Sequence, residues 1–498
     1  MNPVELRQNL KNYHAQLETF YLEKNLGQNN SVSRVEIEEN ATDLFSASTV
    51  KSLEEIIKES ANLGETEREA RQNLLNIVRL RFLKNQTNEI AQELKNCQDS
   101  VSIKFQNETL NVSDAFRKIS ISPDAPRRKE IFVRLLNGKS FCANLFVEKI
   151  SLRREETKAL GFANFQKLSE ELTGLNFYQL SQTAQYFLEK TEKLYFRQLS
   201  ELAIKSDLNE KSLYFADFLY LRNQLEQEKI FDGKNLRSVY ARLLENFNFS
   251  EYKIPNIVFK QVPGNYQTKV FRVRLPEEIY FCVTNKNGVS SFIKFLRGFG
   301  EANQAAWTSK KLVERFPEFV FSPDACLSKA YGFLFQTLLT EETFLRKTLR
   351  VENEKLSALI KRENQFWLLF EMRREMLRFV LETQIFSASE NLEVICRETA
   401  KTFTGNLGFR FEEQQMLWEI SENFSSLTKV RAFLFAFGLR EYLRERYGFD
   451  WWQKRKAFEE LIDFWNTAER YKAERMAQMI GFETSFDLVA ENFKAKRN

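Results

Sequence analysis

The scarcity of glycine and proline limits most strongly what this chain can fold into. The sequence has only 16 glycines and 8 prolines in 498 residues. Turn-rich β proteins need both residue types, whereas the interior of a helix excludes them. The sequence is instead rich in helix formers, and most of its 47 phenylalanines recur at helical spacing. We therefore expect a mainly α fold with the phenylalanines in its core.

The helical pattern begins with an amphipathic segment at 4–24, and from 151 to 248 it is almost continuous, with breaks near Gly174 and near Gly233. Short apolar runs between turn residues predict one small β-sheet near 255–285. Alternating apolar and polar residues at 100–110 indicate a further short hairpin. The length of the chain suggests more than one domain. We predict an N-terminal helical lobe at 1–138 and a second helical domain at 139–498 that contains the β element.

Charge and hydropathy argue against nucleic acid and membranes as partners. The 73 basic and 68 acidic side chains give a net charge of +5, and the one dense basic stretch is the short tail Lys494–Asn498. A nucleic-acid-binding surface needs a concentrated basic patch. No apolar run approaches the roughly 18 residues of a membrane span, and the segment Met1–Arg7 lacks the apolar character of a signal peptide. We expect a cytoplasmic protein that binds neither nucleic acid nor membrane.

The cysteines give no sign of a disulfide framework. Cys97, Cys142, Cys282, Cys326 and Cys396 are scattered, odd in number and without a C-x-x-C pair. This usage is typical of reduced thiols in a cytosolic protein. We therefore predict buried, reduced thiols. A cysteine nucleophile is not expected either, because the chain offers no suitable histidine as its base.

Residues 290–304 form a predicted helix with the frame of a zinc peptidase but without its ligands. In such a helix, His-Glu-x-x-His places two zinc ligands on one face and a general base between them. Here Arg297, Gly298 and Glu301 occupy these three places. Arginine stays protonated and offers only hydrogen-bond donors, so it cannot bind a metal. The single histidine, His14, lies far upstream, and we expect it to be solvated rather than a ligand.

Several segments together resemble one known family in their order and spacing. A long helical region, a small β element, the degenerate helix and a further helix at 324–338 follow one another. This order resembles the thimet oligopeptidase and oligoendopeptidase F family of gluzincin-like zinc metallopeptidases over nearly the whole chain. The segments that carry the resemblance are Leu160–Phe165, Phe271–Tyr280, Phe292–Ala302, Ser328–Phe335 and Arg440–Trp452.

The resemblance implies an elongated, two-lobed helical fold with a deep central cleft. In active members it implies zinc-dependent hydrolysis of peptide bonds. In this register Lys329 stands where the family has its third ligand, normally a glutamate. Together with Arg297, Gly298 and Glu301, it replaces the base and every ligand. The family's substrate-stabilising histidine and tyrosine also have no counterpart before Arg431. We therefore expect neither a catalytic residue nor zinc in this chain.

The substituted positions suggest a structural role instead. Arg297 and Glu301 lie at i and i+4 on one face, and Lys329 is expected to face them from the neighbouring helix. Our hypothesis is that these three residues form an ion network that replaces the metal's structural role, with little net gain in stability. The alternative is that Arg297 and Glu301 form an ordinary surface pair.

Three functions of different classes fit these observations. The first is a catalytically inactive homologue whose cleft binds peptides or a protein partner. The second is an active metalloendopeptidase or oligopeptidase with an unorthodox site, and the third is an unrelated all-α scaffold or interaction protein. The first requires the helices at 290–304 and 324–338 to pack side by side on the wall of a deep cleft, and the third predicts no such cleft. The oligomeric state is left open.

Overall fold

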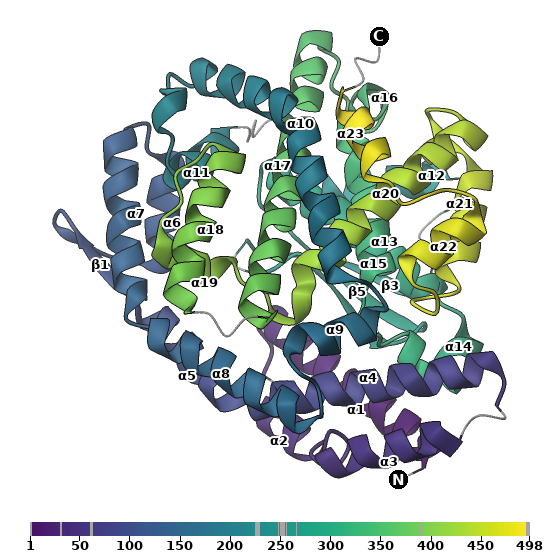
Figure 1. Ribbon diagram of the computed structural model, residues 1–498. Helices are drawn as coiled ribbons and strands as arrows, with labels where there is room; N and C mark the ends of the chain where they lie inside the picture. The colour runs from purple at the N-terminus through teal and green to yellow at the C-terminus, as the bar shows by residue number, and fades with distance from the viewer. Residues whose placement is uncertain are drawn as a thin grey trace. The chain divides into compact units, whose positions relative to one another are not determined.

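The chain folds mainly into α-helices, which confirms the predicted fold class (Figure 1). The computed structural model describes residues 2–494 except 30–31, 60–62, 225–229, 248, 250–253, 255, 265 and 388–390. The helices are α1 (Pro3–Asn25), α2 (Arg34–Glu39), α3 (Ala47–Lys58), α4 (Glu65–Gln86), α5 (Asn88–Ser100), α6 (Val112–Ile121), α7 (Ala125–Ser140), α8 (Ala143–Ala159), α9 (Phe165–Thr173), α10 (Phe177–Lys205), α11 (Phe215–Gln224), α12 (Leu236–Asn246), α13 (Val289–Trp307), α14 (Lys310–Arg315), α15 (Cys326–Gln336), α16 (Glu342–Lys347), α17 (Glu354–Ser387), α18 (Leu392–Leu407), α19 (Met416–Glu419), α20 (Ser425–Tyr447), α21 (Arg455–Trp465), α22 (Ala473–Ile480) and α23 (Phe486–Lys494).

Both predicted β elements are present. Strands β1 (Ser102–Phe105) and β2 (Glu108–Asn111) form an antiparallel hairpin. Strands β3 (Ile257–Val262), β4 (Lys269–Arg274) and β5 (Glu278–Thr284) form a three-stranded sheet in the order β3-β5-β4. The central strand β5 is parallel to β3 and antiparallel to β4.

The chain divides into two compact units, and each is built from separated segments. The first unit comprises residues 1–82, 227–361 and 431–485, and the second comprises the remaining segments 83–226, 362–430 and 486–498. Neither unit ends at residue 138, and the domain division predicted there stays a prediction. The two-lobed arrangement and the central cleft also stay predictions.

The core of the first unit is formed by the three-stranded sheet and the helix that covers it. Helix α13 lies against β5, β4 and β3, and α15 packs beside α13 (Figure 1). Phe281 of β5 stacks on Phe295 of α13, with ring centroids 5.7 Å apart. Phe299 meets Phe335 of α15 edge to face at 4.8 Å. These aromatic pairs attach the helix pair to the sheet.

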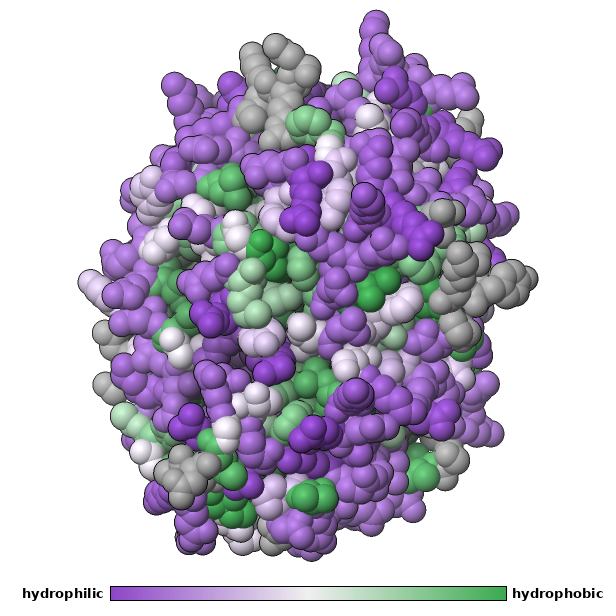
Figure 2. Space-filling view, turned by 90° about the vertical axis from the view of Figure 1, so that its right-hand side faces the viewer, coloured by the Kyte–Doolittle hydropathy of each residue, from purple (hydrophilic) through white to green (hydrophobic). Residues whose placement is uncertain are grey.

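The second unit has its own aromatic core around α17. Phe424 contacts Phe165, Phe177, Phe379 and Phe386, and all five rings are buried. The expectation that phenylalanines fill the core is confirmed at these positions. The face of the molecule in Figure 2 is mainly hydrophilic, with hydrophobic residues in small separate groups. None of the described helices has both the length and the apolar character that crossing a membrane requires.

The prediction of reduced thiols is wrong for two of the cysteines. Cys97 and Cys142 form a disulfide that joins the C-terminal end of α5 to the start of α8. These helices pack together and bring the two Cα atoms to 6.0 Å, a distance that a disulfide can span. Cys282, Cys326 and Cys396 are free and buried, as predicted. Disulfides are rare in cytosolic proteins, so the expected cytoplasmic location loses the support that it drew from the cysteines.

Candidate functional site

Helices α13 and α15 contact each other backbone to backbone. A Cβ atom on Gly300 would lie 2.3 Å from the carbonyl oxygen of Tyr331, and one on Gly332 would lie 3.0 Å from that of Arg297. Glycine at both contact points allows the two backbones to approach this closely. The prediction that the helices at 290–304 and 324–338 pack side by side is therefore confirmed. Their place on the wall of a cleft stays a prediction.

Gly298, at the place of the general base, lies on the face of α13 that packs into the core, so a side chain here would not reach open space. It is buried, and a Cβ atom there would lie only 2.4 Å from the ring of Phe281 in β5. A glutamate side chain at this position would collide with that ring unless Phe281 moved. Close packing between α13 and the sheet thus explains why a glycine stands here. In the register that aligns Gly298 with the general base, the space for that base is filled by Phe281.

Arg297, at the place of the first histidine ligand, connects α13 to α15. Its Nε donates a hydrogen bond to Oε1 of Gln336 at 2.5 Å, and its guanidinium lies 4.5 Å above the ring of Phe333. Within the described part of the chain, neither Glu301 nor Lys329 takes part in an ion pair, with Arg297 or with any other residue. The three charges of the hypothetical ion network are therefore not joined directly, and its structural role stays a prediction.

The start of α15 is fixed by two carboxylates, the buried Glu469 and the half-buried Asp324. Glu469 accepts hydrogen bonds from the backbone N–H groups of Leu327 at 3.0 Å and Ser328 at 2.7 Å. These are two of the donors that the first turn of a helix leaves unpaired. Just before the helix, Asp324 accepts a hydrogen bond at 2.6 Å from the buried Arg431 of α20. These contacts hold α15 in position beside α13.

The residues present do not fit the zinc ion that the resemblance implies. His14 is half-buried and stacks face to face on Phe321, with ring centroids 4.0 Å apart, so the expectation of a solvated histidine holds only in part. Burial, aided by the charge of Arg81, lowers the pKa of His14 to about 3. Among the residues that the structure describes, no group of three or more His, Cys, Asp or Glu side chains is placed to hold a metal ion.

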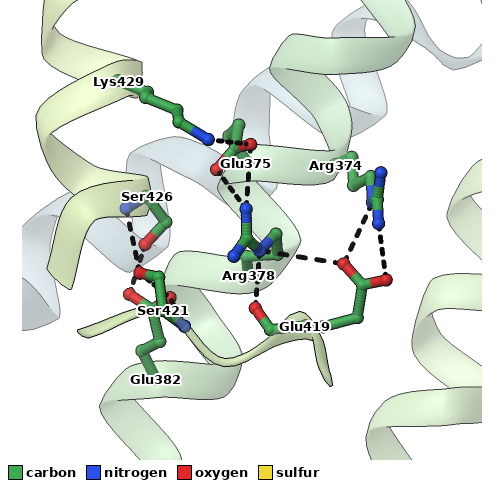
Figure 3. A network of polar contacts seen from close by, with 8 residues as sticks. All are labelled: Arg374, Glu375, Arg378, Glu382, Glu419, Ser421, Ser426 and Lys429. Carbon is green, nitrogen blue, oxygen red and sulfur yellow. Dashed lines mark hydrogen bonds and ion pairs between the residues drawn. The ribbon is translucent and has the colours of Figure 1, made fainter. Parts of the chain in front are cut away.

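A buried polar network that we did not predict lies in the second unit, on one face of α17 (Figure 3). Arg374 donates to both carboxylate oxygens of Glu419 at 3.0 and 2.6 Å. Arg378 donates to the carbonyl oxygen of Glu419 at 2.5 Å and to the carboxylate of Glu375 at 3.0 Å. The four-residue steps from Arg374 to Arg378 and Glu382 are the sequence signal, because they place three charges on one face of a largely buried helix.

Glu382 holds the turn that precedes α20 (Figure 3). It is fully buried and accepts hydrogen bonds from the backbone N–H of Ser421 at 2.9 Å and from the hydroxyl groups of Ser421 and Ser426. Within this turn, Asn423 and Phe424 have φ angles of 55° and 51°, values that residues other than glycine rarely adopt. Burial outweighs the hydrogen bonds and raises the pKa of Glu382 to about 7. The network can therefore bind one proton near neutral pH.

Comparison with known proteins shows likeness at the level of structure alone. No protein-family model matches the chain, and no curated protein is detectably similar in sequence. Among solved structures, the chain is similar to a carboxypeptidase of Pyrococcus furiosus, with a TM-score of 0.63 and 14% sequence identity over 99% of both chains. At this identity the likeness shows the fold. The chain thus shares the fold of this carboxypeptidase over 99% of its length, whereas membership of the oligopeptidase family named from sequence is not shown.

Gly300 and Gly405 form a matched pair for testing the helix contact. We expect Gly300→Ala to destabilise the protein by roughly 1–3 kcal/mol, because the methyl group meets the backbone of α15. Gly405 of α18 has open space around its Cβ position, so Gly405→Ala should stabilise by about 0.5–1 kcal/mol. Urea unfolding followed by circular dichroism measures both. Equal effects of the two substitutions would contradict the contact.

The raised pKa of Glu382 makes the stability of the protein depend on pH. The ordinary pKa of glutamate is 4.5, so between that value and about 7 the folded protein keeps a proton that the unfolded chain has lost. The contribution of Glu382 to stability therefore falls as pH rises through this window, by about 3 kcal/mol at most. In Glu382→Gln the side chain is neutral at every pH, so its stability should fall less between about pH 5 and about pH 8. Identical pH profiles from urea unfolding would refute this.

Proposed function

We propose that this protein is a catalytically inactive relative of the oligopeptidase-type zinc metallopeptidases and that it binds peptides or a protein partner. The likeness to a carboxypeptidase over the whole chain supports a peptidase-type scaffold. The observation that carries the loss of activity is the filled space at Gly298, where the ring of Phe281 occupies the volume that a base would need. Because function resides in particular sites and not in the fold itself, a scaffold that lacks the catalytic residues can still bind a peptide or a protein.

The ligand positions support the same conclusion. Arg297 offers no lone pair to a metal and is engaged by Gln336 and Phe333. Glu301 remains as one possible oxygen ligand, but a catalytic zinc site needs three protein ligands and an open position. An active enzyme with an unorthodox site would need another such cluster, and none occurs among the described residues.

Metal analysis and a cleavage assay test the proposal directly. We expect protein purified without a histidine tag to contain no stoichiometric zinc and to leave quenched-fluorescent peptides uncleaved, with or without added zinc. A titration of the same peptides should still detect binding. Stoichiometric zinc together with cleavage that a chelator abolishes would overturn the proposal. Absence of both cleavage and peptide binding would favour the third function, an unrelated scaffold.

Rebuilding the site tests the register and the role of Phe281 together. We first combine four substitutions, Arg297→His, Gly298→Glu, Glu301→His and Lys329→Glu. This variant should bind little zinc, because the glutamate introduced at position 298 collides with Phe281. Addition of Phe281→Ala should open that space and raise zinc uptake, measured by elemental analysis after gel filtration. Phe281→Ala alone serves as the control and should bind none. If the rebuilt protein binds no zinc with either residue at 281, the register is wrong.

A further inference from the structure

The second unit contains a cavity that the proposed function does not use. Its volume is about 650 Å³, within the range of sites that bind small molecules. The walls come from α5, the end of α7, α8, the start of α18 and α19. The disulfide between Cys97 and Cys142 joins two of these elements, and Cys142 itself lines the cavity. This cross-link fixes the wall in advance, which reduces the cost of ordering it when a ligand binds.

Much of the lining is apolar. Phe146, Ile150, Leu417 and Trp418 contribute to the walls, and Val147, which also lines the cavity, is 42% exposed. Apolar surface of this kind gains free energy when a hydrocarbon body covers it. A ligand of this cavity therefore needs an apolar part.

Two cations line the same cavity without a carboxylate partner. Lys139 lies with its Nζ 4.0 Å above the ring of Trp418, and Arg154 donates one hydrogen bond to the carbonyl oxygen of Ile385. In the described part of the chain, neither forms an ion pair. Burial lowers the pKa of both side chains. A half-buried cation without a counter-charge is costly, and an anionic ligand would relieve that cost.

Two carboxylates limit the charge that such a ligand can carry. Glu393 and Glu413 also line the cavity, and burial, aided by their charges, raises the pKa of the Cys396 thiol to about 11. Arg397 also lines the cavity, but it is paired with Glu398 at 3.6 Å, so the two carboxylates would still repel a second negative charge. A monoanion therefore suits the cavity better than a doubly charged phosphate ester.

We propose that this cavity binds monocarboxylates that carry an apolar body. Two sources share this chemistry, an alkyl carboxylate and the free C-terminus of a peptide with apolar side chains. Lys139 and Arg154 hold the carboxylate, and the apolar walls cover the rest. The proposal does not depend on the presence or absence of peptidase activity.

Isothermal titration of the full-length protein tests this site. The probes are decanoate, decyl phosphate, N-acetyl-leucyl-phenylalanine and the amide of that dipeptide. We expect at least one of the two carboxylates to bind, with the matching phosphate or amide about tenfold weaker or more. The better of the two carboxylates identifies the source. If neither carboxylate binds at millimolar concentration, or if phosphate and amide bind as well as the carboxylates, the proposal fails.

A pair of lysines on α7 provides the matched control. Lys129 lies 4.2 Å above the ring of Tyr214, as Lys139 lies above Trp418, but it does not line the cavity. Lys139→Gln should weaken binding of the carboxylate about tenfold, whereas Lys129→Gln should leave it unchanged. Ser151→Trp, at an exposed lining position, should block binding while thermal unfolding confirms that the protein is folded. Equal affinities of the two lysine variants, or full binding by Ser151→Trp, would place the ligand elsewhere.

Discussion

The close contact between α13 and α15 is the constraint on which the first unit depends. Gly300 and Gly332 let the two helix backbones meet, and Gly298 lets α13 settle onto the ring of Phe281. A Cβ atom on Gly300 would collide with the backbone of α15 and one on Gly298 with the ring of Phe281, while one on Gly332 would make a tight contact. The same packing bears on the proposed register. If Gly298 stands where a zinc peptidase has its base, a glutamate there would collide with the ring of Phe281.

Local patterns were enough to predict the elements, whereas the predicted roles of the site residues stay predictions. The three-residue and four-residue steps at 4–24 and the alternation at 100–110 act within one element, and both structures formed as expected. The resemblance to a peptidase family added the pairing of α13 with α15, which no local pattern contains. The reason for Gly298 could not be read in the same way, because it depends on Phe281, which lies on a separate strand.

The features that were missed all depend on residues far apart in the chain. Cys97 and Cys142 are separated by 45 residues and meet only because α5 and α8 pack together. The charges on α17 have a visible spacing, yet their burial and their partners on the segment around Ser421 follow from tertiary structure. His14 was expected in solvent because its neighbours along the chain are polar, whereas Phe321 covers one face of its ring. The periodicity of a sequence identifies the apolar and polar faces of a helix or strand, but it does not identify which other residues pack against those faces.

The stability of the packing around α13 does not rest on an ion network of Arg297, Glu301 and Lys329. A structural zinc ion contributes about 10–16 kcal/mol to folding in small domains that have little else. The hydrogen bond from Arg297 to Gln336 and its contact with Phe333 contribute only about 2–5 kcal/mol together. Here α13 also buries most of its length against the sheet and α15. Because apolar burial of about 25 cal/mol per Å² over such a surface supplies most of the stability, the fold does not need ion pairs of Glu301 and Lys329, which form none with the residues that the structure describes.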